Sequence, residues 1–194
     1  MPETISQTIE RVGLIPVLRA KNAAQAHAIV KAMIAGGVNV VEVTMTVPGA
    51  VGILKELKRE YGNELLLGSG TVTTAEEAEA TIEAGAEFVV SPSFHPEVIT
   101  AWNAGADYVK VFPCSAVGGA SYLKALLAPF PHLKLIPTGG VTLQTAEGFL
   151  RAGAHALGVG SDLVNLAAVD AGTPETITET ARAYLKVLAQ VRQG

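Results

Sequence analysis

The chain has 194 residues, of which 49% are hydrophobic and 16% charged, as expected of one compact domain with a sizeable core. Its formal net charge of −4 excludes the basic surface that attracts nucleic acid or anionic membranes, so local groups would have to hold an anionic substrate. No apolar run is long enough to span a bilayer, the first residues do not resemble a signal peptide, and a single cysteine excludes an internal disulfide. These features predict a cytoplasmic protein without nucleic-acid or membrane partners.

In chain order, the sequence repeats one phrase: a helical stretch that ends in Ala-Gly and is followed at once by a β-rich run. The phrase occurs at residues 35–43, 84–91, 104–111 and 152–159. Glycine directly after a helix can adopt the left-handed conformation that ends it, and the next strand then begins. Strands that alternate with helices in this way predict βαβ units and a parallel sheet.

Seven segments are predicted strands: Leu14–Leu18, Val38–Val43, Leu65–Ser69, Glu87–Ser91, Asp107–Val111, Leu133–Pro137 and Ala156–Gly160. Polar or glycine residues lie at the C-terminal ends of nearly all of them, where barrel enzymes place their active sites. An open doubly wound sheet would instead gather such residues at one switch point. The predicted fold is therefore a TIM-type parallel (β/α) barrel, a single domain over residues 1–194 with a short N-terminal helix. A typical barrel has eight units, and only seven strands are readable here.

Lys110 is the least expected residue of this pattern, because it lies in the otherwise apolar strand Tyr108–Pro113. Burying an ammonium is costly, so a strand lysine either reaches water or has a chemical purpose. A neutral amine at this place could form a Schiff base with a carbonyl substrate. The alternative is a strand-end lysine that extends its amine to solvent, and this residue alone leaves both open.

Glu42 is a second ionisable residue inside an apolar strand, Val40–Thr44. A structural carboxylate in an ion pair at the barrel mouth is the alternative for this residue. A buried carboxylate and a buried lysine in one small barrel are more informative together, because the lysine can act as nucleophile and the glutamate as proton shuttle.

Glycine-rich turns follow the last two predicted strands, Gly139-Gly140 and Gly158-Val-Gly160-Ser161. Barrels often bind phosphate after strands seven and eight, where backbone N–H groups and a helix N-terminus point outward. Ordinary turns are the alternative, but the position of these glycines favours a phosphate site.

Arg19 ends the first strand and could hold a carboxylate with two parallel hydrogen bonds, although a surface salt bridge is equally compatible with the sequence. Thr71 and Thr138 also lie at strand ends and could bond to substrate oxygens.

No metal or other cofactor is expected, because the histidines show no metal-ligand spacing and no paired carboxylates or His/Cys cluster suggest a metal site. His27, His95, His132 and His155 are predicted to be surface or turn residues. Cys114 has no histidine near it in the sequence, which favours a small packing residue over a nucleophile.

At these residues the chain resembles the family of 2-keto-3-deoxy-6-phosphogluconate (KDPG) aldolases, whose members often also cleave 4-hydroxy-2-oxoglutarate (KHG). The resemblance covers almost the whole chain in family order, and no single phrase would carry it alone. The matching phrases are Pro16–Arg19, Gly36–Thr44, Gly68–Val72, Ser91-Pro92, Val109–Pro113, Pro129–Pro131, Pro137–Val141 and Gly158–Ser161.

The resemblance implies a metal-free class I aldolase on a (β/α)8 barrel, usually a homotrimer, whose substrate is a phosphorylated keto acid. It implies that Lys110 forms the Schiff base and that Glu42 is the general acid/base, acting through a water. The implied keto-acid pocket consists of Arg19, Thr71, Pro92, Phe112 and Thr138. The implied phosphate site consists of Gly139, Gly140, Gly160 and Ser161.

The chain departs from the family pattern between Ser91-Pro92 and the lysine strand. Family members carry a further strand there, with a Pro-Gly loop that contributes to the keto-acid pocket. The departure keeps a second reading open, a barrel-derived scaffold or assembly subunit with impaired catalysis. A third reading is another phosphate-binding barrel enzyme, an isomerase or epimerase, which needs a base but no strand lysine.

Overall fold

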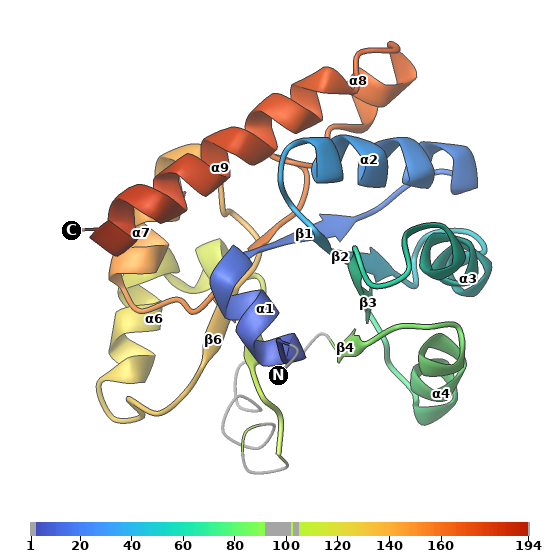
Figure 1. Ribbon diagram of the computed structural model, residues 1–194. Helices are drawn as coiled ribbons and strands as arrows, with labels where there is room; N and C mark the ends of the chain where they lie inside the picture. Colours follow the sequence, from blue (N-terminus) through green and yellow to red (C-terminus); the bar gives the residue numbers. More distant parts are fainter. Residues whose placement is uncertain (1–2, 92–101, 103–104, 194) are drawn as a thin grey trace.

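The computed structural model describes residues 3–91, 102 and 105–193 (Figure 1). Helices and strands alternate along the chain, as the repeated phrase predicts. The strands are β1 (Leu14–Leu18), β2 (Val40–Thr44), β3 (Leu66–Gly70), β4 (Phe88–Val90), β5 (Val109–Val111), β6 (Leu135–Pro137) and β7 (Leu157–Val159). The α-helices are α1 (Ile5–Val12), α2 (Ala23–Ala35), α3 (Ala50–Tyr61), α4 (Ala75–Glu83), α6 (Gly119–Leu127), α7 (Leu143–Arg151), α8 (Leu166–Asp170) and α9 (Glu175–Gln193), and a 3-10 turn, η2, spans Cys114–Val117.

All seven predicted strands are present, and every pair is parallel. One sheet has the order β4-β3-β2-β1-β7, and β5 pairs with β6. A parallel bridge between Thr138 and Gly158 continues the sheet from β7 to β6. The strand order follows a barrel wall, and the predicted TIM-type fold is confirmed.

The observed strands mostly begin one or two residues later than predicted. The fifth, for example, begins at Val109 rather than Asp107, because its ladder starts where the Val109 amide donates to the Lys134 carbonyl at 2.8 Å. The expected left-handed φ occurs at Gly85 (103°) and Gly153 (100°). The first phrase differs, because Gly36, directly after α2, has a right-handed φ of −81° and the left-handed residue is Gly37 at 89°.

Strands β4 and β5 are the two ends of this strand order. Within residues 3–91, 102 and 105–193 no backbone pairing joins them, so the described strands do not close the ring. An eight-stranded barrel would have one more strand to place between them.

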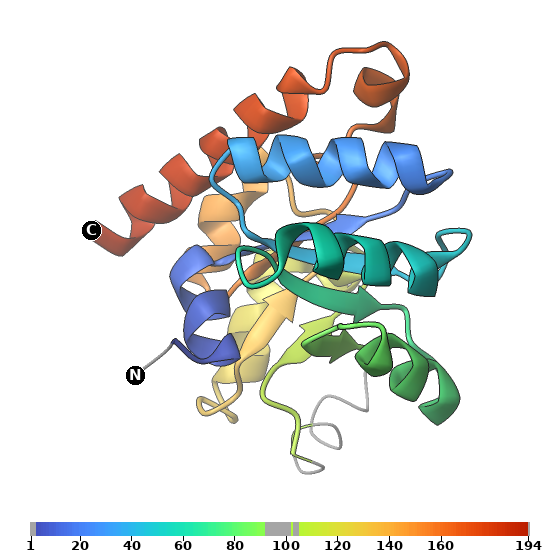
Figure 2. The ribbon, with the colours of Figure 1, turned by 45° about the vertical axis from the view of Figure 1, so that its right-hand side comes forward.

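The helices surround the strands. Helices α2, α3 and α4 lie outside the sheet on one side and α6, α7 and α9 on the other, while α1 lies across one end (Figures 1 and 2). Thr4 caps α1 with a capping box, and the Arg192 guanidinium of α9 donates to the Glu10 and Arg11 carbonyls at its other end. Ile9 and Val12 of α1 are buried, so this helix closes the N-terminal end of the barrel.

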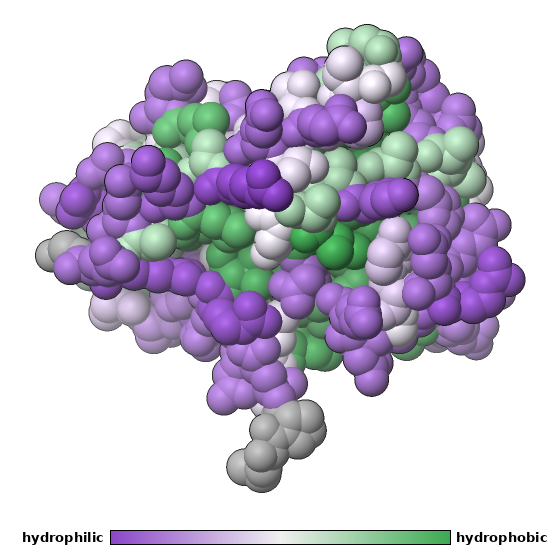
Figure 3. All heavy atoms as spheres, turned by 45° about the horizontal axis from the view of Figure 1, so that its top comes forward, coloured by the Kyte–Doolittle hydropathy of each residue, from purple (hydrophilic) through white to green (hydrophobic). Residues whose placement is uncertain are grey.

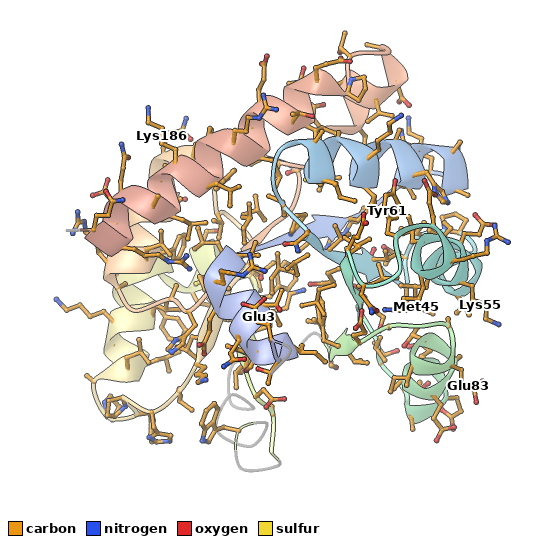
Figure 4. The ribbon with its side chains drawn as sticks, viewed as in Figure 1. Glu3, Met45, Lys55, Tyr61, Glu83 and Lys186 are labelled. Atoms are coloured by element: carbon orange, nitrogen blue, oxygen red, sulfur yellow. The ribbon has the colours of Figure 1, made fainter. Side chains whose placement is uncertain are left out.

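The outer faces of the helices are polar. Lys55, Glu83 and Lys186 point away from the sheet on α3, α4 and α9 (Figure 4). On the face shown in Figure 3, hydrophilic side chains cover most of the surface, with smaller apolar patches between them. None of the described helices is long and apolar enough to cross a membrane.

Candidate active site

Lys110 and Glu42 form an ion pair. Lys110 lies on β5 and Glu42 on β2, and these strands are not neighbours in the sheet order, so the pair spans the barrel interior. The Lys110 Nζ donates to Glu42 Oε1 at 3.1 Å and to Oε2 at 3.4 Å. The side chains are only 10% and 3% exposed, so Lys110 does not simply extend into solvent.

Burial dominates the electrostatics of Glu42. Loss of water around the carboxylate raises the pKa of Glu42 above its ordinary value, while Lys110 and Arg19 act in the opposite direction. A carboxylate of this kind holds a proton more readily than an exposed one. Beside an amine, it is suited to accept and return protons.

A cavity of about 390 Å³ lies at the C-terminal ends of β1, β5, β6 and β7. Seven of the predicted site residues line it: Arg19, Phe112, Thr138, Gly139, Gly140, Gly160 and Ser161. These residues come from four separate parts of the chain and meet because parallel strands share one carboxyl edge.

Lys110 and Glu42 are not in the lining of this cavity. Phe112 connects them to it, because its ring centroid lies 6.0 Å from Lys110 Nζ and the ring also lines the cavity. Phe112 is 38% exposed, which is unusual for a phenylalanine in so apolar a chain.

Of the two remaining predicted pocket residues, the structure describes only Thr71. Thr71 lies at the end of β3, outside the cavity lining, and has a left-handed φ of 60°. It is the only described non-glycine residue with positive φ, and such strain is concentrated at functional sites. Pro92 lies outside the described residues.

Thr138 presents an unsatisfied polar atom. Its residue is 4% exposed, and its Oγ1 is buried without a hydrogen-bond partner among the residues that the structure describes. A buried hydroxyl usually has a partner, and this one belongs to a residue of the cavity wall. It is therefore suited to bond to an oxygen of a bound molecule.

The two glycine turns provide backbone donors. Gly139 and Gly140 have left-handed φ values of 82° and 78°. Within residues 3–91, 102 and 105–193, no hydrogen bond is donated by the amides of Gly140 or Ser161. Free backbone N–H groups in such turns can bind an anion, and Arg19 adds a positive charge to the same cavity.

Asp162 is a cavity residue that sequence reasoning missed. Its Oδ2 accepts hydrogen bonds from the Tyr184 hydroxyl at 2.5 Å and from the Leu143 amide at 3.3 Å. It thereby ties the turn after β7 to α7 and α9. Its place directly after Ser161 was a usable signal, but nothing in the sequence pointed to Tyr184.

The structure also bears on the predictions that Cys114 is a packing residue and that the histidines are surface or turn residues. Cys114 is fully buried, and burial raises the pKa of its thiol to about 11, which confirms a packing residue. His27 contacts Glu56 and Glu60 on α3, and His95 lies outside the described residues. Within the described part of the chain, no group of three or more His, Cys, Asp or Glu side chains could hold a metal ion.

Comparison with known proteins identifies the family. The sequence profile of the "KDPG and KHG aldolase" family matches residues 5–104 and 95–180. The chain belongs to this aldolase family. Its members are class I aldolases, which are carbon–carbon lyases, and the resemblance seen in the sequence is confirmed.

Curated relatives cover nearly the whole chain. The 2-dehydro-3-deoxy-phosphogluconate aldolase of Treponema pallidum is 31% identical over 207 residues, covering 95% of this chain and 98% of the relative. The KHG/KDPG aldolase of Escherichia coli K12 is 31% identical and covers 93% of this chain and 94% of its own. The first alignment is longer than the 194-residue chain, so this aldolase lacks residues that the relative has.

Solved structures agree with the fold. KDPG aldolase from Legionella pneumophila, with pyruvate captured as a covalent carbinolamine, has a TM-score of 0.85 at 29% identity and covers 92% of this chain and 97% of its own. A native KDPGal structure has a TM-score of 0.84 at 30% identity and covers 93% of this chain and 96% of its own. The aldolase therefore keeps the family fold.

Proposed function

We propose that this aldolase cleaves KDPG to pyruvate and glyceraldehyde 3-phosphate through a Schiff base on Lys110, and that it also cleaves KHG. The observation that carries the proposal is the buried contact between Lys110 and Glu42, an amine beside a carboxylate whose pKa burial raises. Aldol cleavage through a Schiff base requires these two groups, a nucleophilic amine and a proton shuttle.

Each step has a residue to perform it. Lys110 Nζ attacks the C2 carbonyl, and the carbinolamine loses water to give a protonated Schiff base. A base removes the proton of the C4 hydroxyl and the C3–C4 bond breaks, so that C4 becomes the aldehyde of glyceraldehyde 3-phosphate, which leaves. The electrons of the broken bond pass into the iminium to give an enamine. The enamine takes a proton at C3, and water then releases pyruvate. Glu42 moves these protons, through a water as the family resemblance implies.

The cavity residues suit the two ends of the substrate. Arg19 and the free hydroxyl of Thr138 would bind the keto-acid carboxylate and oxygen, together with Thr71, Pro92 and Phe112. The turns Gly139-Gly140 and Gly160-Ser161 would bind the phosphate through their amides. Three relatives motivate the choice of substrates, since their names include KDPG, KHG and 2-dehydro-3-deoxy-6-phosphogalactonate. The Pro137-Thr138 pair resembles the phosphogluconate branch.

A coupled assay tests this proposal. KDPG, KHG and the phosphogalactonate isomer are supplied in turn, and released pyruvate is followed with lactate dehydrogenase and NADH. We expect the highest kcat/KM with KDPG, a lower value with KHG and the lowest with the phosphogalactonate isomer. Release of no pyruvate from any substrate by folded protein would refute the proposed activity.

A second function has one observation in its favour. Strands β4 and β5 do not pair within the described residues, so a wall beside Lys110 differs from that of an eight-stranded barrel. A scaffold or assembly subunit would keep the fold and oligomerise without turnover. We propose a cytoplasmic homo-oligomer, a trimer by family resemblance, formed from one barrel domain. Sedimentation measures the assembly, and assembled protein that releases no pyruvate would support the scaffold.

A further inference from the structure

Glycines on the inner face of β3 leave the space that the catalytic carboxylate occupies. Side chains alternate across a strand, and the Ser69 hydroxyl points outward, where it bonds to Thr81 of α4 at 2.9 Å. Gly68 and Gly70, on either side of it, therefore face the barrel interior. In the sheet register they lie opposite Glu42 and Thr44 of β2.

The space is filled by neighbouring side chains. A Cβ on Gly70 would lie well inside the 3.0 Å limit that real Cβ atoms respect, and the three atoms it would meet first are Oε1, Cδ and Cγ of Glu42. A Cβ on Gly68 would overlap the Phe88 ring in the same way. The backbone of Gly70 is ordinary, because its φ is not among the positive values. Glycine is therefore needed at position 70 for the space that its missing side chain leaves, and not for an unusual backbone conformation.

We infer that Gly70 is a positioning residue for Glu42. The inference rests on the proposed function, because it concerns the carboxylate that would move the protons. Glu42 packs against the bare backbone of β3 on one side and faces Lys110 Nζ at 3.1 Å on the other. A methyl group at position 70 pushes the carboxylate away from its present place, because the three atoms nearest to it all belong to Glu42.

Gly70→Ala tests the inference directly. A displacement of about 1 Å in a catalytic group can lower the rate about 100-fold, so we expect kcat for KDPG to fall by about that factor. The KM should change less than threefold or so, because Gly70 does not line the substrate cavity. Overpacking of the core should lower the melting temperature by about 3–10 °C.

The decisive comparison is with a shorter carboxylate. Glu42→Asp removes one methylene and makes room for the new methyl group, so Gly70→Ala should cost much less in that background, in both kcat and melting temperature. Gly52→Ala is the matched control, because Gly52 is an exposed residue of α3 with nothing within 4 Å of an added Cβ. It should leave kcat unchanged and should not lower the melting temperature, because alanine is favoured over glycine inside a helix.

The outcomes separate the inference from the proposed function. The inference would be overturned if Gly70→Ala lowered kcat and the melting temperature equally in the wild-type and Glu42→Asp backgrounds. A Gly70→Ala variant with a kcat within twofold of wild type would also overturn it. Wild-type protein that releases no pyruvate would overturn the function, and the melting-temperature comparison would still report the steric coupling. If Gly70→Ala does not fold, recovery of folded protein by adding Glu42→Asp supports the coupling, and failure to recover it contradicts the coupling.

Discussion

Replacing Lys110 by methionine gives the strongest prediction on stability. Methionine keeps an unbranched side chain of similar length but removes the ammonium that faces Glu42. Because the two side chains are only 10% and 3% exposed, Glu42 would remain desolvated without its partner. Removing one member of a buried ion pair costs about 3–5 kcal/mol when the other stays charged.

The loss of stability in Lys110→Met should depend on pH, and the titration of Glu42 decides whether it grows or shrinks as the pH rises. Burial already raises the pKa of Glu42 above the ordinary 4.5, and Lys110 opposes that rise. A raised carboxyl pKa in the folded state adds stability below the unfolded pKa, and this stability is lost as pH rises through the folded pKa. Lys110→Met removes the opposing charge, so the loss extends to higher pH. The deficit relative to wild type should therefore grow as the pH rises above the ordinary range of a carboxyl group.

Urea unfolding at several pH values measures the deficit. Lys134→Met is the matched control, because its partner Glu10 is 42% exposed and Lys134 itself 37%. That surface pair should be worth about 0–1 kcal/mol. Lys134 lowers the pKa of Glu10, so the control deficit should be flat above about pH 5. A Lys110→Met deficit below about 1 kcal/mol at every pH would refute the buried-pair reasoning.

Three further predictions concern the cavity and the thiol. Thr138→Val should leave the urea midpoint nearly unchanged, because Oγ1 has no partner within the described residues, but raise KM for the keto acid about tenfold; an unchanged KM would contradict the contact. Ser161→Asp places a negative charge at the proposed phosphate site, so KM should rise about tenfold or more for KDPG and little for KHG; equal rises would contradict the assignment. Burial raises the pKa of Cys114 to about 11, so the native thiol should resist labelling at about pH 8 and react only on unfolding; rapid native labelling would be the contrary result.

The strands were predictable because local signals coincide in them. Each of the four Ala-Gly phrases joins a helix end to a β-rich run, and all seven predicted strands are present. The meeting of Glu42 and Lys110, 68 residues apart, followed from the rule that parallel strands share a carboxyl edge. The same rule placed Arg19 and Thr138 in one cavity.

Other features depend on tertiary distances that no local pattern encodes. The role of Gly70 appears only when the Glu42 side chain is placed against its backbone. The contact between Asp162 and Tyr184 depends on how α9 packs beside α7. Thr71 was predicted in the pocket, but its left-handed φ could not be foreseen from a threonine.

Trapping with borohydride in the presence of pyruvate tests the central claim most directly. Reduction of a Schiff base fixes pyruvate on the lysine that carries it, and peptide mass mapping then locates the adduct. The account predicts one adduct, at Lys110, that is absent from Lys110→Met and still present in Lys134→Met. Folded wild-type protein that forms no adduct, or one that carries it at another lysine, would contradict the account.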